Sequence, residues 1–574
     1  MLKAVFSRKP ATAAPAFVAL GGAMALAMMT TARAQAPASD AAMPPPPPPS
    51  CAQTDPGAAG PVSTAPVSTS PGTDASSANP PACGQDQTPP APKIDNSPVG
   101  VSSLSSLDLF SAGRETGLGV DLWKGSSAAI ARQVIPPLDT AQLSPAGALL
   151  ARAVLATTAT APDGAGADAV LAAERVKALL DLGDAEGAGM ILDRTPGLSS
   201  SGALSQVAAE VALINDQPDK ACAIGDGLSV DRDAIYWLRL RAFCQARAGK
   251  PDLAQLTLTL ANQQAPDPTF GRLMGAVIAG GGDPGPASLR NGLDYALSVQ
   301  LKLDLTPALP HAAPPIARKL AALTPPPPPP PPPVADASGA AGPGALPGAA
   351  PAPTLVSEAD ILGQLRGPPD FAGYLAAAKA AEPSIAGLVQ AKAPLTAPVA
   401  LATAALAAGD LSDADAIRAG LVQDQIPGAG PGDLAILDAT LAAAHGKPDS
   451  ATLDRLVELG QQGEGLARQR IQIAAAFDFA LGTPMGPDAR AAFAGLSLAP
   501  GKVSVTRQLT LDAAADAGLK GETALIALWV AADAGAGGPS PAERVRVIRA
   551  LRRAGLGPYA QAFAVEGLVQ LQGR

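Results

Sequence analysis

Aromatic residues are scarce in this chain. Phe, Trp and Tyr together make up 3% of its 574 residues, whereas hydrophobic residues as a whole reach 47%. A core of this composition is built mainly from Ala, Leu and Val, which suits closely packed helices better than a β-rich fold. The length allows two or three domains. We therefore expect an all-α protein.

The signatures of common enzymes and metal sites are also missing. The sequence has no G-x-x-x-x-G-K-[ST] phosphate loop, no G-x-S-x-G nucleophile elbow and no H-E-x-x-H pair. Its only histidines are His311 and His445, and the spacing of its four cysteines suits no zinc site. We therefore expect no catalytic, cofactor-binding or metal-binding residues, and a function that is not enzymatic.

The first 34 residues have the pattern of an export signal. A basic start precedes an apolar stretch, Ala16 to Met29, and Ala32-Arg33-Ala34 matches a cleavage site with small residues. We predict a Sec-type signal cleaved after Ala34, and a periplasmic or secreted protein. The bias toward Ala, Gly and Pro suggests a high-GC Gram-negative bacterium. An uncleaved anchor is the alternative, although the stretch is short and interrupted by glycines.

The chain beyond the signal has neither a net positive charge nor a long apolar run. The formal net charge is −9, and it becomes −13 when the four basic residues of the signal are removed. An acidic protein is a poor ligand for nucleic acid. No later segment reaches about 18 uninterrupted apolar residues, so we expect no stable membrane span after signal cleavage.

Four cysteines in an exported chain suggest disulfides. They fall into two local pairs, Cys51 with Cys83 and Cys222 with Cys244. Cys222 is expected early in one helix and Cys244 in the next, so adjacent antiparallel helices would bring the second pair together. The alternative is two free buried thiols that pack as small hydrophobes.

Two proline-rich segments divide the chain. Residues 35–100 contain almost no large apolar residues, so we expect a disordered tether. The segment 323–356 includes nine consecutive prolines, Pro325 to Pro333, which favour a stiff polyproline II spacer or a docking site for a proline-recognition module. The expected organisation is a signal at 1–34, the tether, a helical arm at 101–322, the linker and a second arm at 357–574. Proteolysis in the linker should release two independent arms.

Turns recur at regular intervals in both arms. In the first arm, alanines that close Gly- or Asp-led turns are 33 residues apart, and in the second arm glycines recur every 36 or 37 residues. Such periods are typical of stacked two-helix units, none of which can bury its apolar face alone. We predict that each alanine is buried on the second helix of a hairpin. The alanines are Ala188, Ala221, Ala254 and Ala287, and the glycines are Gly409, Gly446, Gly482, Gly518 and Gly555.

These units resemble the tetratricopeptide repeat family. When the alanines are matched to the small residue of that family's second helix, the small residue of its first helix falls on Ala209, Ala242 and Gly275. The best-matching unit adds Ala261 and a closing Pro266. The intervals differ from the family's 34 residues, and Leu or Ala replaces most of its aromatic residues. The resemblance implies a right-handed α-solenoid that binds a protein partner.

Five arginines gather on one helix near the C-terminus. The sequence from Ser540 to Glu543 is a capping box that begins this helix, and Val545, Ile548 and Leu551 have the spacing of a buried face. The arginines would form a solvated face, or they could dock an anionic envelope component or an acidic partner protein. They are Arg544, Arg546, Arg549, Arg552 and Arg553.

The sequence favours an exported, non-enzymatic helical-repeat scaffold or adaptor for protein–protein interactions in the bacterial cell envelope. One alternative is an accessory or divergent member of a periplasmic peptidoglycan-processing system, by analogy with lytic transglycosylases that carry helical superhelices; it would require a buried acidic residue. Another is a low-complexity structural protein, because the stretch 155–161 is similar in composition to antifreeze glycopeptides. No partner is identified by the sequence.

Overall fold

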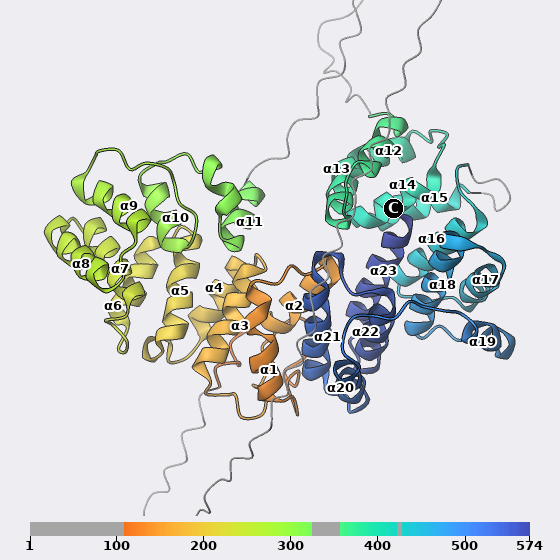
Figure 1. Ribbon diagram of the computed structural model, residues 1–574, viewed down its shortest axis with the longest axis horizontal. Coiled ribbons are helices and arrows are strands. Elements are labelled where there is room, and N and C mark those ends of the chain that lie inside the picture. The colour runs from red at the N-terminus through yellow and green to blue at the C-terminus, as the bar shows by residue number, and fades with distance from the viewer. Residues whose placement is uncertain (1–107, 324–355, 422–426, 574) are drawn as a thin grey trace, which may run out of the picture. The chain divides into compact units, whose positions relative to one another are not determined.

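This computed structural model describes residues 108–323, 356–421 and 427–573. The regular structure in these ranges is helical (Figure 1). These ranges contain twenty-three α-helices, four short 3-10 helices and two isolated β-bridges, but no strand. The all-α prediction is confirmed. No helix in the described ranges is long and apolar enough to cross a membrane. The predicted signal, tether and proline run, with Cys51 and Cys83, lie outside them.

The first range holds α1 to α11, and the other two hold α12 to α23. The bounds in the first range are α1 (Ala128–Val134), α2 (Pro145–Ala156), α3 (Ala169–Asp181), α4 (Ala185–Arg194), α5 (Gly202–Ile214), α6 (Pro218–Gly227), α7 (Ile235–Arg247), α8 (Pro251–Gln264), α9 (Pro268–Ala279), α10 (Gly292–Gln300) and α11 (Pro314–Leu323). The remaining bounds are α12 (Glu358–Arg366), α13 (Phe371–Gln390), α14 (Pro398–Ala408), α15 (Leu411–Ala419), α16 (Pro431–Ala444), α17 (Ser450–Gln462), α18 (Gly465–Ala480), α19 (Pro487–Ala494), α20 (Val505–Asp516), α21 (Lys520–Ala534), α22 (Pro541–Arg553) and α23 (Gly557–Gln572).

Successive helices form hairpins whose turns are closed by one left-handed residue. The backbone angle φ is 90° at Gly183, 58° at Asp216 and 70° at Gly249. The five repeating glycines of the second arm also have positive φ, between 65° and 94°. At each of these positions the N–H bonds to the carbonyl three residues earlier, which ends the preceding helix. Glycine recurs in these turns because it adopts this conformation without a steric penalty from Cβ.

Three of the four repeating alanines lie where the sequence predicted. Ala188 on α4, Ala221 on α6 and Ala254 on α8 are each 0% exposed. Ala287 is half-buried in an irregular segment between α9 and α10, so the prediction was wrong there. This segment, 280–287, carries four glycines and two prolines, which disfavour a helix. The second helix of this unit, α10, therefore starts later than predicted, at Gly292.

The chain turns back on itself after α9. Helix α3 packs on α5, and α7 packs on α9, as expected for neighbouring hairpins. Helix α10, however, packs on α5 as well as on α9, and α11 packs on α3. In a simple stack each unit would contact only its neighbours. The end of the first arm instead covers the first helices of earlier hairpins.

One hydrophobic cluster contains residues from both predicted arms. It includes Leu150 and Val154 on α2, Ile526 and Val530 on α21, and Phe563 on α23. Helix α2 packs against α21 and α23, and α23 also packs on α14, α16, α18 and α22. The C-terminal helix therefore joins elements from much of the chain. The arms share a core, and this finding changes the expectation that they are independent.

A buried ion pair lies where the arms meet. The Arg544 guanidinium on α22 donates to Oε1 of Glu566 on α23 at 2.7 Å, and Oε2 of Glu566 accepts the N–H of Ala146 at 2.7 Å. The two side chains are only 1% and 5% exposed. Ala146 lies in the first turn of α2, where backbone N–H groups have no partner within the helix and a negative charge is favourable. The Glu566 carboxylate therefore connects the two arms.

Cleavage of the linker tests this shared core. We expect that a protease site inserted between Ser338 and Ala350, once cut, leaves two fragments that elute together and unfold in a single transition. The reason is that separation would expose the apolar faces of α2, α21 and α23 and leave the Glu566 carboxylate without its contact to α2. Size-exclusion chromatography with light scattering and calorimetry measures this. Two separately eluting fragments, each with its own transition, would contradict the shared core.

Candidate functional site

A cavity of about 540 Å³ lies against the first helices of successive hairpins in the first arm. Helices α3, α5, α7 and α9 contribute to its walls, and the rest comes from the region from Arg290 to α11 and from Asp139 and Thr140, which precede α2. The fold-back of α10 and α11 therefore encloses a space that the preceding hairpins line. The apolar part of the wall includes Leu180, Val207, Ile214, Phe270, Leu293 and Ile316.

A close contact between α5 and α10 shapes this cavity. Glu210 on α5 accepts the N–H of Gly292, the first residue of α10, through Oε2 at 2.6 Å. A Cβ at position 292 would lie 2.8 Å from that oxygen and 3.1 Å from Cβ of Leu213. A larger residue at position 292 would therefore displace the Glu210 carboxylate or move α10 away from α5. The Glu210 carboxylate satisfies an N–H at a helix start, as Glu566 does for α2.

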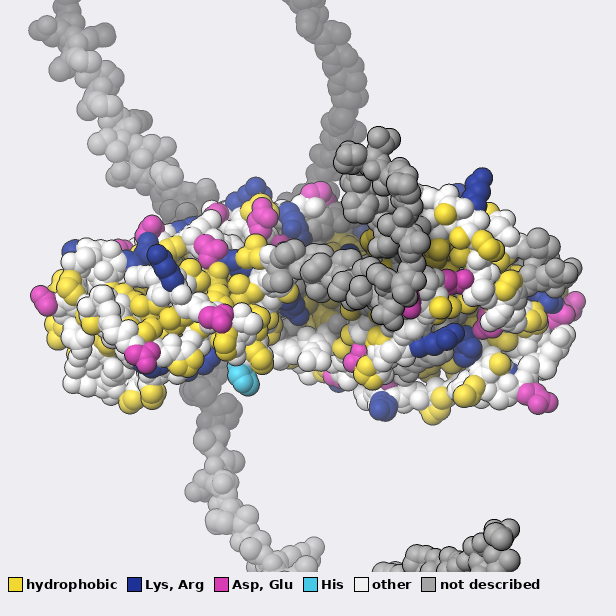
Figure 2. Space-filling view, turned by 90° about the horizontal axis from the view of Figure 1, so that it is seen from above, with side chains coloured by type: hydrophobic (Ala, Val, Ile, Leu, Met, Phe, Trp, Pro, Cys, Tyr) yellow, Lys and Arg dark blue, Asp and Glu magenta, His cyan; other side chains and the backbone are white. Residues whose placement is uncertain are grey.

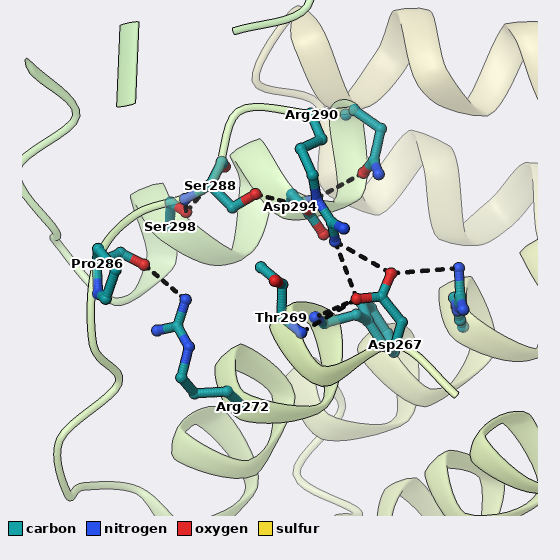
Figure 3. A network of polar contacts seen from close by, with 12 residues as sticks. Asp267, Thr269, Arg272, Pro286, Ser288, Arg290, Asp294 and Ser298 are labelled. Atoms are coloured by element: carbon teal, nitrogen blue, oxygen red, sulfur yellow. Dashed lines mark hydrogen bonds and ion pairs between the residues drawn. The ribbon is translucent and has the colours of Figure 1, made fainter. Parts of the chain in front are cut away.

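Arg290 joins two aspartates at one side of the cavity (Figure 3). Its guanidinium contacts Asp267 at 3.0 Å and Asp294 at 2.7 Å. Asp267 also caps α9 by accepting the N–H groups of Thr269 and Phe270. Burial acts to raise the pKa of Asp267, but its bonds to the Phe270 N–H and Arg290 outweigh that effect, and its pKa lies below the usual value. Asp267 therefore stays ionised and neutralises Arg290.

The irregular segment beside this network is also held in place. Arg272 on α9 donates to the carbonyl oxygen of Pro286 at 2.7 Å (Figure 3). Ser288 donates through its hydroxyl to Asp294 at 2.7 Å and through its N–H to Ser298 at 3.0 Å. These contacts fix the start of α10, since Asp294 and Ser298 both lie on that helix.

Lys177 lies between two aspartates at another side of the cavity. It pairs with Asp139, and its Nζ is 3.6 Å from Asp181, whose side chain is 13% exposed. Burial raises the pKa of Asp181 to about 6, an effect larger than the opposing attraction of Lys177. Bonding to Asp139 helps to raise the pKa of Lys177 despite the opposing effect of burial. Lys177 therefore remains protonated and paired.

Glu210 and Tyr236 are the two cavity residues with buried polar atoms that lack a hydrogen-bond partner among the described residues. These atoms are Oε1 of Glu210 and the hydroxyl oxygen of Tyr236. Burial raises the pKa of Glu210. Burial and, after it, the Glu210 charge raise the pKa of Tyr236 well above its usual value. The two groups are therefore near enough to interact electrostatically, although they do not form a well-aligned hydrogen bond.

No single motif in the sequence predicts this cavity, although the 33-residue interval of the first arm carries a signal for it. Gln206 and Arg239 are one interval apart, as are Lys177 and Glu210, and all four line the cavity. Both pairs fall on the first helices of consecutive hairpins, where equivalent positions point to the same side of a stack. Polar residues repeated at this interval therefore indicated a shared inner surface. The fold-back of α10 and α11 had no such signal.

One of the two predicted cysteine pairs lies within the described residues, and the structure shows it as a disulfide. Cys222 on α6 forms a disulfide with Cys244 on α7, and their Cα atoms are 5.6 Å apart. The bond connects the second helix of one hairpin to the first helix of the next. It lies beside the hydrophobic cluster of Trp237, Leu240 and Phe243 rather than in the cavity.

The arginines of α22 do not form one exposed surface. Arg544 is buried, which corrects its place among the predicted partner-binding residues, because Glu566 and the carbonyl of Phe563 accept its N–H groups. Arg546 pairs with Asp512, and Arg553 with Asp516. Arg549 and Arg552 are exposed. Neither forms an ion pair within the described ranges. The hypothesis that arginines of α22 bind a partner therefore concerns these two side chains, and it remains a prediction.

The histidines and acidic residues give no metal centre within the described ranges. No group of three or more His, Cys, Asp or Glu side chains there is placed to share an ion. His445 ends α16 and contacts Asp415 at 2.9 Å through Nε2.

No protein-family model matches the chain, and no curated protein or solved structure matches it. The cavity is therefore interpreted from its own chemistry.

The raised pKa of Asp181 predicts how stability depends on pH. The folded-state pKa of about 6 exceeds the ordinary value of 3.8, so the folded state binds this proton more tightly. The resulting stabilisation is present below about pH 4 and is lost as the pH rises through 6. We expect Asp181→Asn to gain roughly 1–2 kcal/mol relative to the wild type between pH 4 and pH 7. Urea unfolding at several pH values measures this, and parallel pH profiles of the two proteins would contradict it.

Proposed function

We propose that this chain is an exported, non-enzymatic adaptor that binds a segment of a protein partner in the cavity of its first arm. The observation that carries the proposal is the cavity itself, whose walls come mainly from the first helices of four successive hairpins and from the α10–α11 region. Cavities that are largely apolar, with a few convergent polar groups, are typical binding sites. The protein acts by holding its partner rather than by transforming it.

We interpret the hairpins as a divergent tetratricopeptide-like α-solenoid. The 33-residue interval and the buried alanines on α4, α6 and α8 support this interpretation. The fold-back of α10 onto α5 is a departure from such a stack. It converts an open inner surface into a partly closed one, which suits a short segment of a partner better than a whole domain.

The envelope of a Gram-negative bacterium is the compartment that we propose. The basic start, apolar stretch and Ala32-Arg33-Ala34 site support export. A disulfide between Cys222 and Cys244 suits an oxidising compartment. Arg549 and Arg552 offer a second contact for an anionic envelope component, separate from the cavity.

Two carboxyls of the cavity, Glu210 and Asp181, favour the alternative of a peptidoglycan-processing role, because burial raises the pKa of each, as a general acid requires. Asp181 is paired with Lys177, which leaves Glu210 as the candidate acid. Its Oε2, however, is bound to the N–H of Gly292, so the carboxylate supports the start of α10. Because Oε2 is used in this structural contact, we favour a binding role for the cavity over a catalytic one. The candidate enzyme would release soluble fragments from peptidoglycan, and an adaptor would not.

Blocking the cavity tests the adaptor function. Gln206 on α5 lines the cavity and is exposed, so Gln206→Trp should fill the space without disturbing the core. Gln255 on α8 is exposed outside the cavity, and Gln255→Trp is the matched control. We expect the wild type and Gln255→Trp to capture the same proteins from an envelope extract, and Gln206→Trp to lose them by at least tenfold. Quantitative mass spectrometry compares the three, and equal capture by all of them would contradict the proposal.

A further inference from the structure

The charged groups of the cavity leave one carboxylate without a cation. Lys177, Arg239 and Arg290 are its basic side chains, and its acidic ones are Asp139, Asp181, Glu210, Asp267 and Asp294. Lys177 pairs with Asp139 and Asp181, and Arg290 with Asp267 and Asp294. Arg239 is 3.6 Å from Asp267 and also donates to the carbonyl of Ala265 at 3.0 Å. The basic groups are thus occupied by aspartates.

Glu210 differs from these aspartates. It has no ion pair among the described residues, and its one well-aligned hydrogen bond is with the backbone N–H of Gly292, through Oε2. Its contact with the Tyr236 hydroxyl is not well aligned. The Tyr236 hydroxyl oxygen is buried as well, and Glu210 is the side chain with which it interacts. A buried carboxylate is unfavourable unless a cation or several hydrogen bonds compensate for its lost hydration. Glu210 is therefore the cavity carboxylate without a cation, and a buried tyrosine hydroxyl lies beside it.

We propose that the cavity receives the side-chain ammonium group of a lysine on the partner segment, which donates to Oε1 of Glu210 and to the hydroxyl of Tyr236. This inference rests on the proposed function and names the chemistry of its partner. The ammonium group carries three N–H donors, so it can satisfy both atoms and keep one donor for the peptide or for water. Its charge offsets that of Glu210.

The walls suit the rest of a lysine side chain. Val207, Ile214, Phe270 and Leu293 are buried apolar residues of the lining, against which a four-carbon stem can pack. An anionic ligand would meet an excess of acidic side chains. A neutral alkyl group would gain the apolar contacts but leave Glu210 without a counter-charge. The face of the first arm that carries α10 and α11 exposes hydrophobic side chains between acidic and basic ones, as a peptide-binding surface of mixed character would (Figure 2).

The test compares two capped amino acids that differ in the ammonium group. N-acetyl-lysine methylamide and N-acetyl-norleucine methylamide are titrated into the full chain by calorimetry or ligand-observed NMR. We expect the lysine compound to bind at least tenfold more tightly. In Glu210→Gln, which keeps the acceptor for the Gly292 N–H, this preference should disappear. Tyr236→Phe should weaken lysine binding about threefold.

The matched control removes a glutamate charge that lies outside the cavity. Glu522 on α21 accepts the N–H of Ser127 at 2.9 Å and does not line the cavity, so Glu522→Gln should leave lysine binding unchanged. Circular dichroism verifies that each variant is folded. Equal binding of the lysine and norleucine compounds by the wild type would overturn this inference and leave the adaptor function standing. If neither compound binds, the lysine inference fails, and the capture experiment with Gln206→Trp decides the adaptor function separately.

A free diamine could present the same chemistry. The third compound in the titration is therefore 1,5-diaminopentane, which carries ammonium groups but no peptide backbone. We expect it to bind more weakly than the lysine compound, because it lacks the amide groups of a partner segment. Binding that is tenfold tighter than that of the lysine compound would overturn the assignment to a protein partner.

Discussion

The carboxylate of Glu566 is the contact on which the joining of the two arms depends. One of its oxygens accepts from Arg544 and the other accepts from the N–H of Ala146 at the start of α2. Removing two charges from water is costly, and such a pair is retained only where hydrogen bonds satisfy the remaining groups. Arg544 also donates to the carbonyl of Phe563 and to the side chain of Gln570, which meets this requirement. The pair therefore fixes the position of α2 against α22 and α23.

Four other glutamates accept a backbone N–H in the same way as Glu566. In each case the carboxylate binds a backbone N–H group that is distant in sequence and lies at or near the start of a helix. A core of Ala and Leu side chains offers few distinctive shapes, so it specifies weakly which helices meet. Hydrogen bonds that buried or half-buried carboxylates accept supply that specificity, because a mismatched pairing would leave a charge unsatisfied. The contacts are Glu210 with Gly292, Glu522 with Ser127, Glu543 with Val503, Glu358 with Ala397, and Glu566 with Ala146.

The sequence predicted the local features of the fold well, because they depend on residues within one turn of each other. Gly183 and Gly249 end helices because their backbone conformation favours glycine, and this signal repeats. Contacts between different helices were not predicted from the sequence. Arg544 shares its helix with four exposed or half-buried arginines, and only its pairing with Glu566 on the next helix explains its burial. The cavity depends on the fold-back of α10, which a contact between Glu210 and Gly292 stabilises and no periodic pattern encodes.

The central claim is that the Arg544–Glu566 pair stabilises the fold as a unit, and a double-mutant cycle tests it most directly. Free energies of unfolding are measured in urea for the wild type, Arg544→Met, Glu566→Gln and the double variant, followed by tryptophan fluorescence. Each single change should cost about 3–5 kcal/mol because it leaves a buried charge or acceptor without its partner. The double variant should be at least about 2 kcal/mol more stable than the sum of the single changes implies. Additive single effects, or single effects below about 1 kcal/mol, would contradict the account.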